Sequence, residues 1–588
     1  MLTTTTTTVA LAGLVLTAAT ASATHPPVVK LSAGQVTGGF CSGSGTKLFQ
    51  GIPFAQPPVG KLRFMPPQEL NASYPGGKLD ATKPPSPCIQ WPSPFVAPDP
   101  APSEDCLFLD VYVPPSANAY SKLPVKVWAY GGANVGGAVT YPLYDACNLA
   151  TDSIVVSFNY RLSALGFLGL ESAGIQGNMA LQDYLMALKW VKANIAAFGG
   201  DNKKVMLFGQ SAGGDGTFVL STLPQAKSLI SAAVMQSGGG LDLVPYETAQ
   251  IAGASYAEAL NCSRTDLACL QSKSIPDLFE ASATAPALQN QPLGNVFAMN
   301  VPNASTVESL ILDGKIIKEE PLKAGSKVPI ITGASMSFLI PPKPTPPQIT
   351  CPTMPIRLIA RHRLADSNDG SLFTLPVYGR SPYPVTAHNY TQFLSYFGPS
   401  ISAKINKQYP LSLFNLTGEE STAVVAAVTH IVTTAGYICQ SYKTLRAAMA
   451  AGSPAYAYRF NHTLSCPWLV QNGTSIPPPQ LKDVFGSAHT AEIPLVFANL
   501  DKQPFQQGNC SANSGERELS RTLVAAWTAI AANQSPATPQ QAWPRFDKCK
   551  SEGIYIQDKA EVAKLDVSEC KFWDDIWVEL GGARVPGA

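Results

Sequence analysis

The chain has 588 residues, a length that either several domains or one large α/β enzyme can fill. With 41 Lys and Arg against 40 Asp and Glu, the formal net charge is +1 and there is no basic run, which argues against nucleic acid as a partner. Charged residues make up 14% of the chain, hydrophobic residues 45%, and prolines number 51, so the composition excludes a disordered or coiled-coil protein.

The N-terminal residues predict the compartment. An apolar stretch, Val9 to Ala18, follows a Thr-rich start and leads to a small-x-small site at Ala21-Ser22-Ala23. This order is typical of a secretory signal peptide over residues 1–23, although no Lys or Arg precedes the apolar stretch. The stretch is too short to span a bilayer and no second one reaches that length, so we expect a secreted, extracellular protein without a transmembrane segment.

Two other features favour secretion. The twelve cysteines have no Cys-x-x-Cys spacing that would suggest zinc or redox chemistry, so disulfides are expected. Eight Asn-x-Ser/Thr triplets predict a glycoprotein, although one such triplet alone is common by chance; they begin at Asn71, Asn261, Asn303, Asn389, Asn415, Asn461, Asn472 and Asn509.

Short apolar runs alternate with helix-like segments along the chain. Strands are predicted over Pro124–Tyr130 and Ser153–Phe158, and an amphipathic helix over Asp183–Phe198, stopped by two glycines. Further buried strands are predicted over Val205–Phe208 and Val328–Thr332. This alternation predicts an α/β protein with a large, mainly parallel sheet and helices on both faces. No repeat or linker divides the chain, so residues 24–588 are expected to form one domain.

A Gly-x-Ser-x-Gly pentapeptide stands where the chemistry is expected. It comprises Gly209 to Gly213 with Ser211 at its centre, and it follows the strand over Val205–Phe208 and precedes a helix-compatible run. In that setting two glycines permit a strained turn that exposes the serine hydroxyl, and the next amide, of Ala212, can donate to an oxyanion. The alternative is a Gly-rich turn without catalytic function.

Stretches on either side of this pentapeptide resemble the type-B carboxylesterase/lipase family, the cholinesterase-like α/β-hydrolases. The resemblance extends from about Val28 to Trp577, and its motifs occur in the family's order. It implies an α/β-hydrolase fold, a Ser–acid–His triad, an oxyanion hole formed partly by a Gly-Gly turn, a disulfide-closed flap, and no metal or organic cofactor. The matching stretches are 49–60 (FQGIPFAQPPVG), 104–114 (EDCLFLDVYVP), 177–183 (GNMALQD), 198–201 (FGGD) and 208–214 (FGQSAGG).

His489 is predicted to be the general base. It opens the segment His489-Thr490-Ala491-Glu492-Ile493-Pro494, which looks like the family's catalytic-histidine loop. His430 lies in a helix-like run, where a histidine that only packs is the better interpretation. The other four histidines lie at the mature N-terminus, in an anomalous segment, or beside or within glycosylation triplets; they are His25, His362, His388 and His462.

The acid of the triad is predicted to be Asp369, with Asp366 in reserve. The family carries an acid just before a glycine, shortly after a strand that ends in glycine. Here residues 336–365, rich in proline and free of acids, separate Gly333-Ala334-Ser335 from Asp366 to Phe373. Deleting them restores the family spacing closely, so we interpret them as a retained intron or a late insertion. Removing Cys351 with them would leave an odd eleven cysteines. The alternative for Asp369 is a turn-stabilising Asp-Gly.

Gly131 and Gly132, after the strand that bears Trp128, are predicted to complete the oxyanion hole with Ala212, the alternative being a structural turn. Three residues depart from the family pattern and bear on substrate preference. Tyr130 replaces a usual histidine, Asn134 a usual aromatic residue, and Gln210 the common acid before the serine.

The resemblance also implies two disulfides, Cys88–Cys106, closing the flap, and Cys262–Cys269. Cys549 and Cys570 are a third possible pair. The resulting interpretation is a secreted enzyme that cleaves carboxylic esters through an acyl-serine intermediate. Two alternatives stay open: an interfacial triacylglycerol lipase, and a non-catalytic binding protein on the same fold, which retention of Ser211 and His489 argues against.

Overall fold

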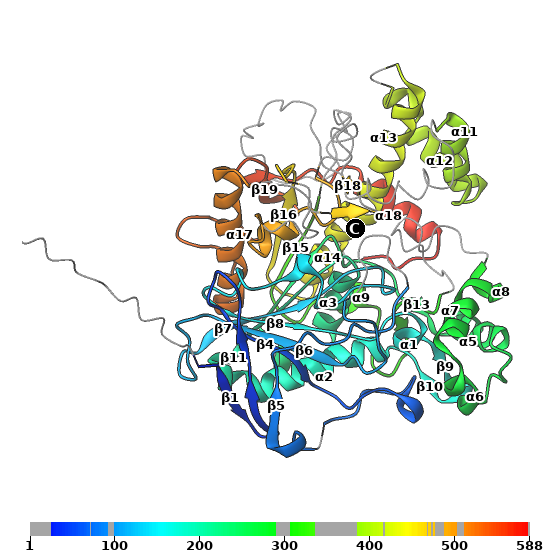
Figure 1. Ribbon diagram of the computed structural model, residues 1–588. Helices are drawn as coiled ribbons and strands as arrows, with labels where there is room; N and C mark the ends of the chain where they lie inside the picture. Colours follow the sequence, from blue (N-terminus) through cyan, green and yellow to red (C-terminus); the bar gives the residue numbers. More distant parts are fainter. Residues whose placement is uncertain are drawn as a thin grey trace, which may run out of the picture.

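A large mixed sheet forms the centre of the protein (Figure 1). The computed structural model describes residues 25–70, 72–91, 99–289, 306–335, 385–415, 418–466, 469–471, 474–476, 487–501 and 511–585. Across these residues the sheet has eleven strands in the order β20-β19-β16-β15-β12-β11-β7-β8-β6-β4-β3. Their bounds are β3 Gly39–Phe40, β4 Lys47–Pro53, β6 Phe108–Val113, β7 Leu123–Ala129, β8 Ile154–Phe158, β11 Gly200–Gln210, β12 Ala232–Gln236, β15 Ile330–Ser335, β16 Ala455–Phe460, β19 Glu552–Ile556 and β20 Ala560–Lys564.

The middle of the sheet is parallel and its edges are antiparallel. Each neighbouring pair from β8 through β7, β11, β12, β15 and β16 to β19 is parallel. The strands β6, β4 and β3 at one edge and β20 at the other run antiparallel to their neighbours. The predicted, mainly parallel sheet is confirmed.

Helices cover both faces of this sheet. Trp128 of β7 pairs with Ser157 of β8, and side chains alternate between the two faces along each strand. Lys126, two residues from Trp128, therefore lies on one face, and Phe158, next to Ser157, lies on the other. The ring of Phe158 contacts Tyr184 of α2 (Met179–Asn194) with centroids 4.8 Å apart. On the other face Lys126 Nζ donates to the carbonyl oxygen of Val524, in α17 (Ser514–Asn533), at 3.4 Å. The α/β class that the sequence predicts is therefore observed.

Local signals located the elements well, but not all of their ends. The predicted helix starts earlier, at Met179, because Asn178 takes a left-handed conformation that turns the chain into the helix. Its last turn is the 3-10 helix η5 (Ile195–Phe198), ended by Gly199 with φ 92°. The predicted four-residue strand around Phe208 extends to the eleven residues of β11.

A second apolar core lies beside the sheet. It joins α11 (Ala387–Ser395), α12 (Pro399–Gln408), α13 (Glu420–Thr433) and α18 (Cys570–Glu579). Helix α13 continues through a π-helical turn, η7 (Thr434–Ile438), into α14 (Cys439–Ala450). This 31-residue run is long and apolar enough to cross a membrane, so the expectation that no second stretch reaches that length is wrong. However, 94% of its most apolar window is buried inside the protein, as in a core helix.

Several disulfides link distant parts of the chain. The two predicted bonds, Cys88–Cys106 and Cys262–Cys269, are present, together with Cys41–Cys147 and Cys439–Cys570. The suggested Cys549–Cys570 pair is wrong. Cys570 begins α18, which packs against α14 and η7, so the sulfur that it meets belongs to Cys439. Cys549 is also disulfide-bonded, to a different residue.

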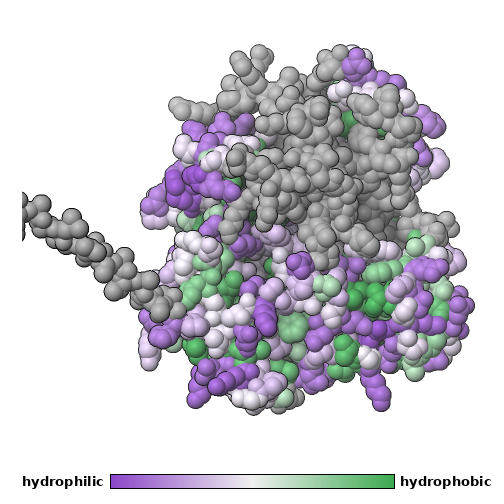
Figure 2. All heavy atoms as spheres, viewed as in Figure 1, coloured by the Kyte–Doolittle hydropathy of each residue, from purple (hydrophilic) through white to green (hydrophobic). Residues whose placement is uncertain are grey.

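Polar and apolar side chains are interspersed on the surface. Figure 2 shows hydrophilic residues over most of the coloured part of the visible face, with small apolar areas between them. The most exposed large hydrophobic residues are Val28, Phe40, Val59, Tyr120, Ile251, Tyr396 and Val562, which come from well-separated parts of the chain. Such scattered exposure is normal for a globular protein.

Candidate active site

Ser211 lies on a strained turn between β11 and α3 (Ala212–Thr222). Its backbone has φ 55° and ψ −130°, a conformation that costs a residue with a side chain on the order of 1–3 kcal/mol. The flanking glycines make the turn possible: a Cβ on Gly213 would collide with the carbonyl oxygens of Ala129 and Tyr130, and one on Gly209 with that of Gly213. The turn therefore needs glycine on both sides of the serine, as the pentapeptide predicts.

Gly131 follows the end of β7 and lies directly against the serine. A Cβ at this position would be 2.6 Å from the carbonyl oxygen of Gln210 and 2.9 Å from Cβ of Ser211. Among the described residues, no acceptor pairs with the amides of Gly131, Gly132 or Ala212. Three backbone donors beside one serine are the arrangement that stabilises an oxyanion.

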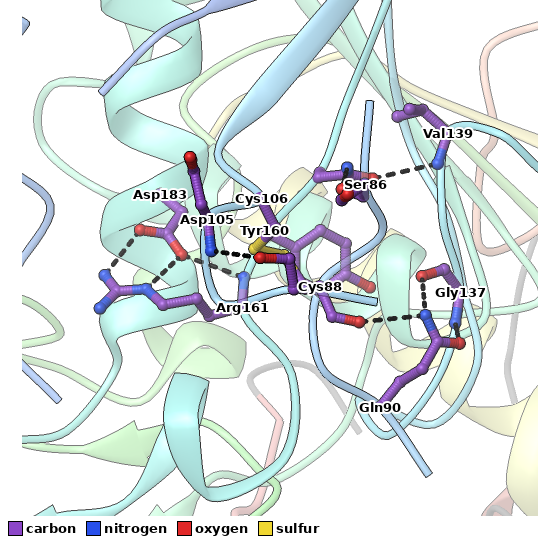
Figure 3. The surroundings of a disulfide bond; sticks show 12 residues. Ser86, Cys88, Gln90, Asp105, Cys106, Gly137, Val139, Tyr160, Arg161 and Asp183 are labelled. Carbon is purple, nitrogen blue, oxygen red and sulfur yellow. Dashed lines mark hydrogen bonds and ion pairs between the residues drawn. A yellow bond between two sulfur atoms is a disulfide. The ribbon is translucent and has the colours of Figure 1, made fainter. Parts of the chain in front are cut away.

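The loop that carries these glycines is fastened to the flap. Figure 3 shows Gln90 between the Cys88–Cys106 disulfide and Gly137. The Gln90 side chain donates to the carbonyl oxygens of Cys88 and Gly137, both at 3.2 Å, and accepts from the amide of Gly137 at 3.1 Å. The disulfide-closed segment thereby supports the glycine loop from its far side.

Tyr130, which replaces a usual histidine of the family, is fully buried below the same loop. Its ring stacks on Tyr160 with centroids 4.5 Å apart. The Tyr160 hydroxyl donates to the carbonyl oxygen of Tyr130 at 2.7 Å, and burial raises the pKa of both phenols well above the usual value. Tyr130 is thus a packing residue that holds the start of the glycine loop.

The structure brings His489 to the turn formed by residues 209–213, called the nucleophile turn after the proposed role of Ser211, across 278 residues of sequence. The imidazole is buried, and its Nε2 is 2.8 Å from the side-chain nitrogen of Gln210, the residue before Ser211. A neutral His489 accepts this hydrogen bond at Nε2, the atom that a general base uses. The histidine predicted from sequence to be the base therefore contacts the residue that directly precedes Ser211.

The sequence did not predict that two residues, Gln210 and Tyr437, contact His489. Gln210 was noted only as a departure from the family, and nothing in its position predicts that its amide meets the imidazole. Tyr437 lies in the π-helical turn η7, with its ring centroid 4.9 Å from that of His489. Single π-helical turns are frequent at functional sites, but the helix-like sequence around Tyr437 gives no signal of one.

A buried network holds the loop that begins at His489. Glu492 accepts a hydrogen bond from the Gln236 amide at 3.2 Å, and the other end of Gln236 accepts from the indole of Trp527 at 3.3 Å. Gln236 ends β12, next to β11, so the histidine loop is fixed at the carboxyl edge of the parallel strands. Ligands of open α/β sheets bind at this edge.

The predicted acids, Asp369 and Asp366, and the insert over residues 336–365 lie outside the described residues. The strand that precedes them, β15, is described and ends at Ser335. In this part of the sheet the Ser237 amide donates to the carbonyl oxygen of Gly333 at 2.8 Å, so the chain leaves β15 at the same edge as the nucleophile turn. The assignment of Asp369 stays a prediction.

Two other described histidines pair with carboxylates elsewhere. His430 Nε2 is 3.0 Å from Glu569. Burial raises the pKa of Glu569, but hydrogen bonds from His430 and Tyr409 and the charge of His430 together lower it below its usual value. His462 lies 3.3 Å from Glu516, near the start of α17. Both contacts give these histidines structural partners away from Ser211.

One cluster among the described residues has ligand types that suit a metal ion, but it does not form a metal site. Cys41, Asp145 and Cys147 bring their ligand atoms together, but the two sulfurs are joined in a disulfide. Disulfide sulfurs cannot act as thiolate ligands.

Comparison with known proteins agrees with this geometry. A family model described as "Carboxylesterase family" matches residues 25–573. Para-nitrobenzyl esterase of Bacillus subtilis (strain 168) is 31% identical over 539 residues, covering 90% of this chain and 94% of that protein. Human cocaine esterase is 28% identical, covering 93% and 91%.

A solved structure described as PNB esterase superposes with a TM-score of 0.69 at 26% identity, covering 93% of this chain and all of that one. The mixed sheet is accordingly that of an α/β-hydrolase, and the protein is a carboxylic ester hydrolase. The chain belongs to the carboxylesterase family.

Proposed function

We propose that this protein hydrolyses carboxylic esters through an acyl-Ser211 intermediate, with His489 as the general base and Asp369 as the acid that orients it. The observation that supports the proposal is the juxtaposition at one strained turn of a serine, three backbone amides without described acceptors, and the imidazole of His489. Each has the role that acyl transfer needs: nucleophile, oxyanion hole and base.

In the first step, Oγ of Ser211 attacks the ester carbonyl carbon while Nε2 of His489 takes the hydroxyl proton. The carbonyl oxygen becomes an oxyanion that the amides of Gly131, Gly132 and Ala212 stabilise. Collapse of this intermediate expels the alcohol, which receives the proton from the imidazolium. Water then repeats the sequence on the acyl-enzyme and releases the acid. For this cycle Nε2 of His489 must give up its hydrogen bond with the Gln210 amide and accept one from the Ser211 hydroxyl.

The test is covalent labelling with a fluorophosphonate, which phosphonylates an activated serine. We expect one equivalent on the peptide that contains Ser211, and loss of both labelling and p-nitrophenyl butyrate hydrolysis in Ser211→Ala. Ser221→Ala is a matched control, because Ser221 lies in the same helix and its hydroxyl is bound to the carbonyl oxygen of Phe218. Hydrolysis by Ser211→Ala at the wild-type rate would refute the mechanism.

The lipase alternative is tested by the dependence of rate on substrate solubility. An esterase follows saturation kinetics on dissolved p-nitrophenyl esters, whereas an interfacial lipase gains activity above the solubility limit. We propose the esterase because the para-nitrobenzyl esterase and cocaine esterase relatives suggest small-molecule esters. A sharp rise in rate at the appearance of an emulsion would favour the lipase instead.

We also propose that the protein is secreted and glycosylated. The disulfides support an oxidising compartment, and Asn261 and Asn415 are exposed and available to a glycosyltransferase. Asn461 does not suit the same role, because it is buried and its side-chain nitrogen donates to the Tyr555 hydroxyl at 2.6 Å. Glycosidase treatment should lower the mass of the secreted protein, and the peptide containing Asn461 should carry no glycan.

A further inference from the structure

A small cavity lies beside the nucleophile turn. It has a volume of about 60 Å³ and is lined on one side by Ala212, Asp215 and Val219 of α3 and on the other by the segment 239–244. Aromatic and aliphatic side chains make up much of the wall, including Phe167, Leu181 and Leu310. At about 10–15 Å³ for each water-sized group, the cavity holds about four to six such groups.

The position of His489 assigns this cavity to the acyl half of the ester. His489 gives its proton to the leaving alcohol, so the alcohol must lie on the imidazole side of Ser211. Neither His489, Gln210 nor Ser211 itself lines the cavity, whereas Ala212, which follows the serine and whose amide is proposed to face the oxyanion, does. The group that stays on Ser211 after the alcohol leaves is therefore the one that enters the cavity.

Asp215 gives the cavity a polar group at a defined depth. Its amide donates to the carbonyl oxygen of Ser211 at 2.9 Å, which makes it the residue one helical turn, or about 6 Å, beyond the serine. Its Oδ1 accepts from the amide of Gly239 at 2.6 Å. Among the described residues the carboxyl has no second hydrogen bond and no ion pair, so its other oxygen is left for a ligand.

The second carboxyl of the cavity has different surroundings. Asp242 accepts a hydrogen bond at Oδ1 from the amide of Ala583 at 2.6 Å, its Oδ2 is fully buried without a hydrogen bond from any described residue, and the charge of Lys443 attracts it. Within the described part of the chain Asp215 has no cationic neighbour of this kind, and burial raises its pKa to about 7. Burial thus disfavours a full charge at this carboxyl, and a neutral partner costs less to bury there than an ammonium ion.

We propose that Asp215 is a specificity-determining residue that accepts a hydrogen bond from a hydroxyl group on the acyl chain, so that the preferred substrates are esters of short hydroxy acids. The apolar wall takes the methylene groups of the chain, and the free carboxyl oxygen accepts the hydrogen bond that the hydroxyl group donates. This inference rests on the proposed function, because it takes Ser211 as the nucleophile and His489 as the donor to the alcohol.

The test compares two substrates that differ only in hydrogen-bond donation: the p-nitrophenyl esters of 3-hydroxybutyrate and 3-methoxybutyrate. The measured quantity is the ratio of their kcat/KM values in the wild type and in Asp215→Asn. The variant keeps an acceptor for Gly239 but turns an amide donor toward the cavity, which suits the methoxy oxygen. We expect the ratio of kcat/KM for the hydroxyl ester to that for the methoxy ester to fall by about tenfold, which is the change in rate expected from the loss of one hydrogen bond.

Asp110→Asn is the matched control. Asp110 is also fully buried, its pKa is also raised to about 7, and it also accepts from a backbone amide, that of Gly51, but it does not line the cavity. Its substrate ratio should equal that of the wild type. An unchanged ratio in Asp215→Asn, with a thermal midpoint near the wild-type value, would overturn the proposal. Fluorophosphonate labelling distinguishes failure of this inference from failure of the proposed function. Labelling of Ser211 with an unchanged substrate ratio refutes only the role of Asp215, whereas absence of labelling refutes the acyl-Ser211 mechanism.

Discussion

Replacing Gly131 by alanine tests the oxyanion hole most directly. The new Cβ would be 2.6 Å from the carbonyl oxygen of Gln210 and 2.9 Å from Cβ of Ser211. Real Cβ atoms essentially never approach other atoms closer than 3.0 Å, so the glycine loop and the nucleophile turn must separate by at least about 0.4 Å. Both partners belong to the backbone or to the nucleophile itself, and neither can rotate away.

The kinetic consequence follows from the precision that acyl transfer requires. Misplacing a reacting group by about 1 Å can cost about 10²-fold in rate, and losing one oxyanion donor costs about 10² to 10³-fold in kcat. We therefore expect kcat of Gly131→Ala on p-nitrophenyl butyrate to fall by about 10²-fold, with a smaller change in KM. Overpacking should also lower the free energy of unfolding by about 1–3 kcal/mol.

Gly136→Ala is the matched control in the same loop. A Cβ at Gly136 meets only the Gln90 side-chain oxygen, at 3.5 Å, which is an ordinary contact. Steady-state kinetics and thermal denaturation of both variants decide the matter. If Gly131→Ala keeps kcat within about twofold of the wild type, or if Gly136→Ala loses as much as Gly131→Ala, the assignment of Gly131 to the oxyanion hole is wrong.

Three further predictions follow from contacts in the structure. His489→Ala should lower kcat by several orders of magnitude, because a triad without its base fails nearly as badly as one without its nucleophile. His430→Ala, which loses contacts with Glu569, Tyr409 and Phe414 away from Ser211, should stay active; the reverse result would reassign the base. Gln210→Glu places a carboxylate 2.8 Å from Nε2 of His489 and favours the imidazolium, so the acid limb of the pH profile of kcat/KM should move to higher pH, whereas the neutral Gln210→Met should leave it in place. Burial raises the pKa of Asp110 to about 7, so the stabilisation from its protonated form is complete below about pH 4 and lost as pH rises through 7. Urea denaturation should therefore show the advantage of wild type over Asp110→Asn shrinking by about 3 kcal/mol from pH 5 to pH 8, because each pH unit between pH 5 and the folded-state pKa of about 7 costs about 1.4 kcal/mol, and a constant difference would contradict the buried titration.

Features that short stretches of chain control could be predicted without the structure. Gly209 is required by a collision with the carbonyl oxygen of Gly213 inside one strand–turn–helix unit, so the pentapeptide and its flanking strand and helix predict the turn, whereas Gly213 is also required by the carbonyl oxygens of Ala129 and Tyr130 at the end of β7. The apolar runs of β7, β8 and β15 reveal a buried parallel sheet because such strands are apolar on both faces. The small disulfide loop between Cys262 and Cys269 spans only seven positions and is likewise local.

Tertiary structure alone decided the contacts between distant segments. Cys570 bonds to Cys439, 131 positions away, because two helices pack together, and no spacing rule chooses that partner. The Gln210 amide reaches His489 across 279 positions because the histidine loop is fixed at the carboxyl edge of the sheet. The carboxyl of Asp215 faces a cavity only because α3 packs beside the segment 239–244. Local backbone conformation depends on neighbouring residues and can be predicted from a short stretch of sequence. Contacts between distant side chains depend on how whole helices and strands pack, and a single sequence does not identify those contacts.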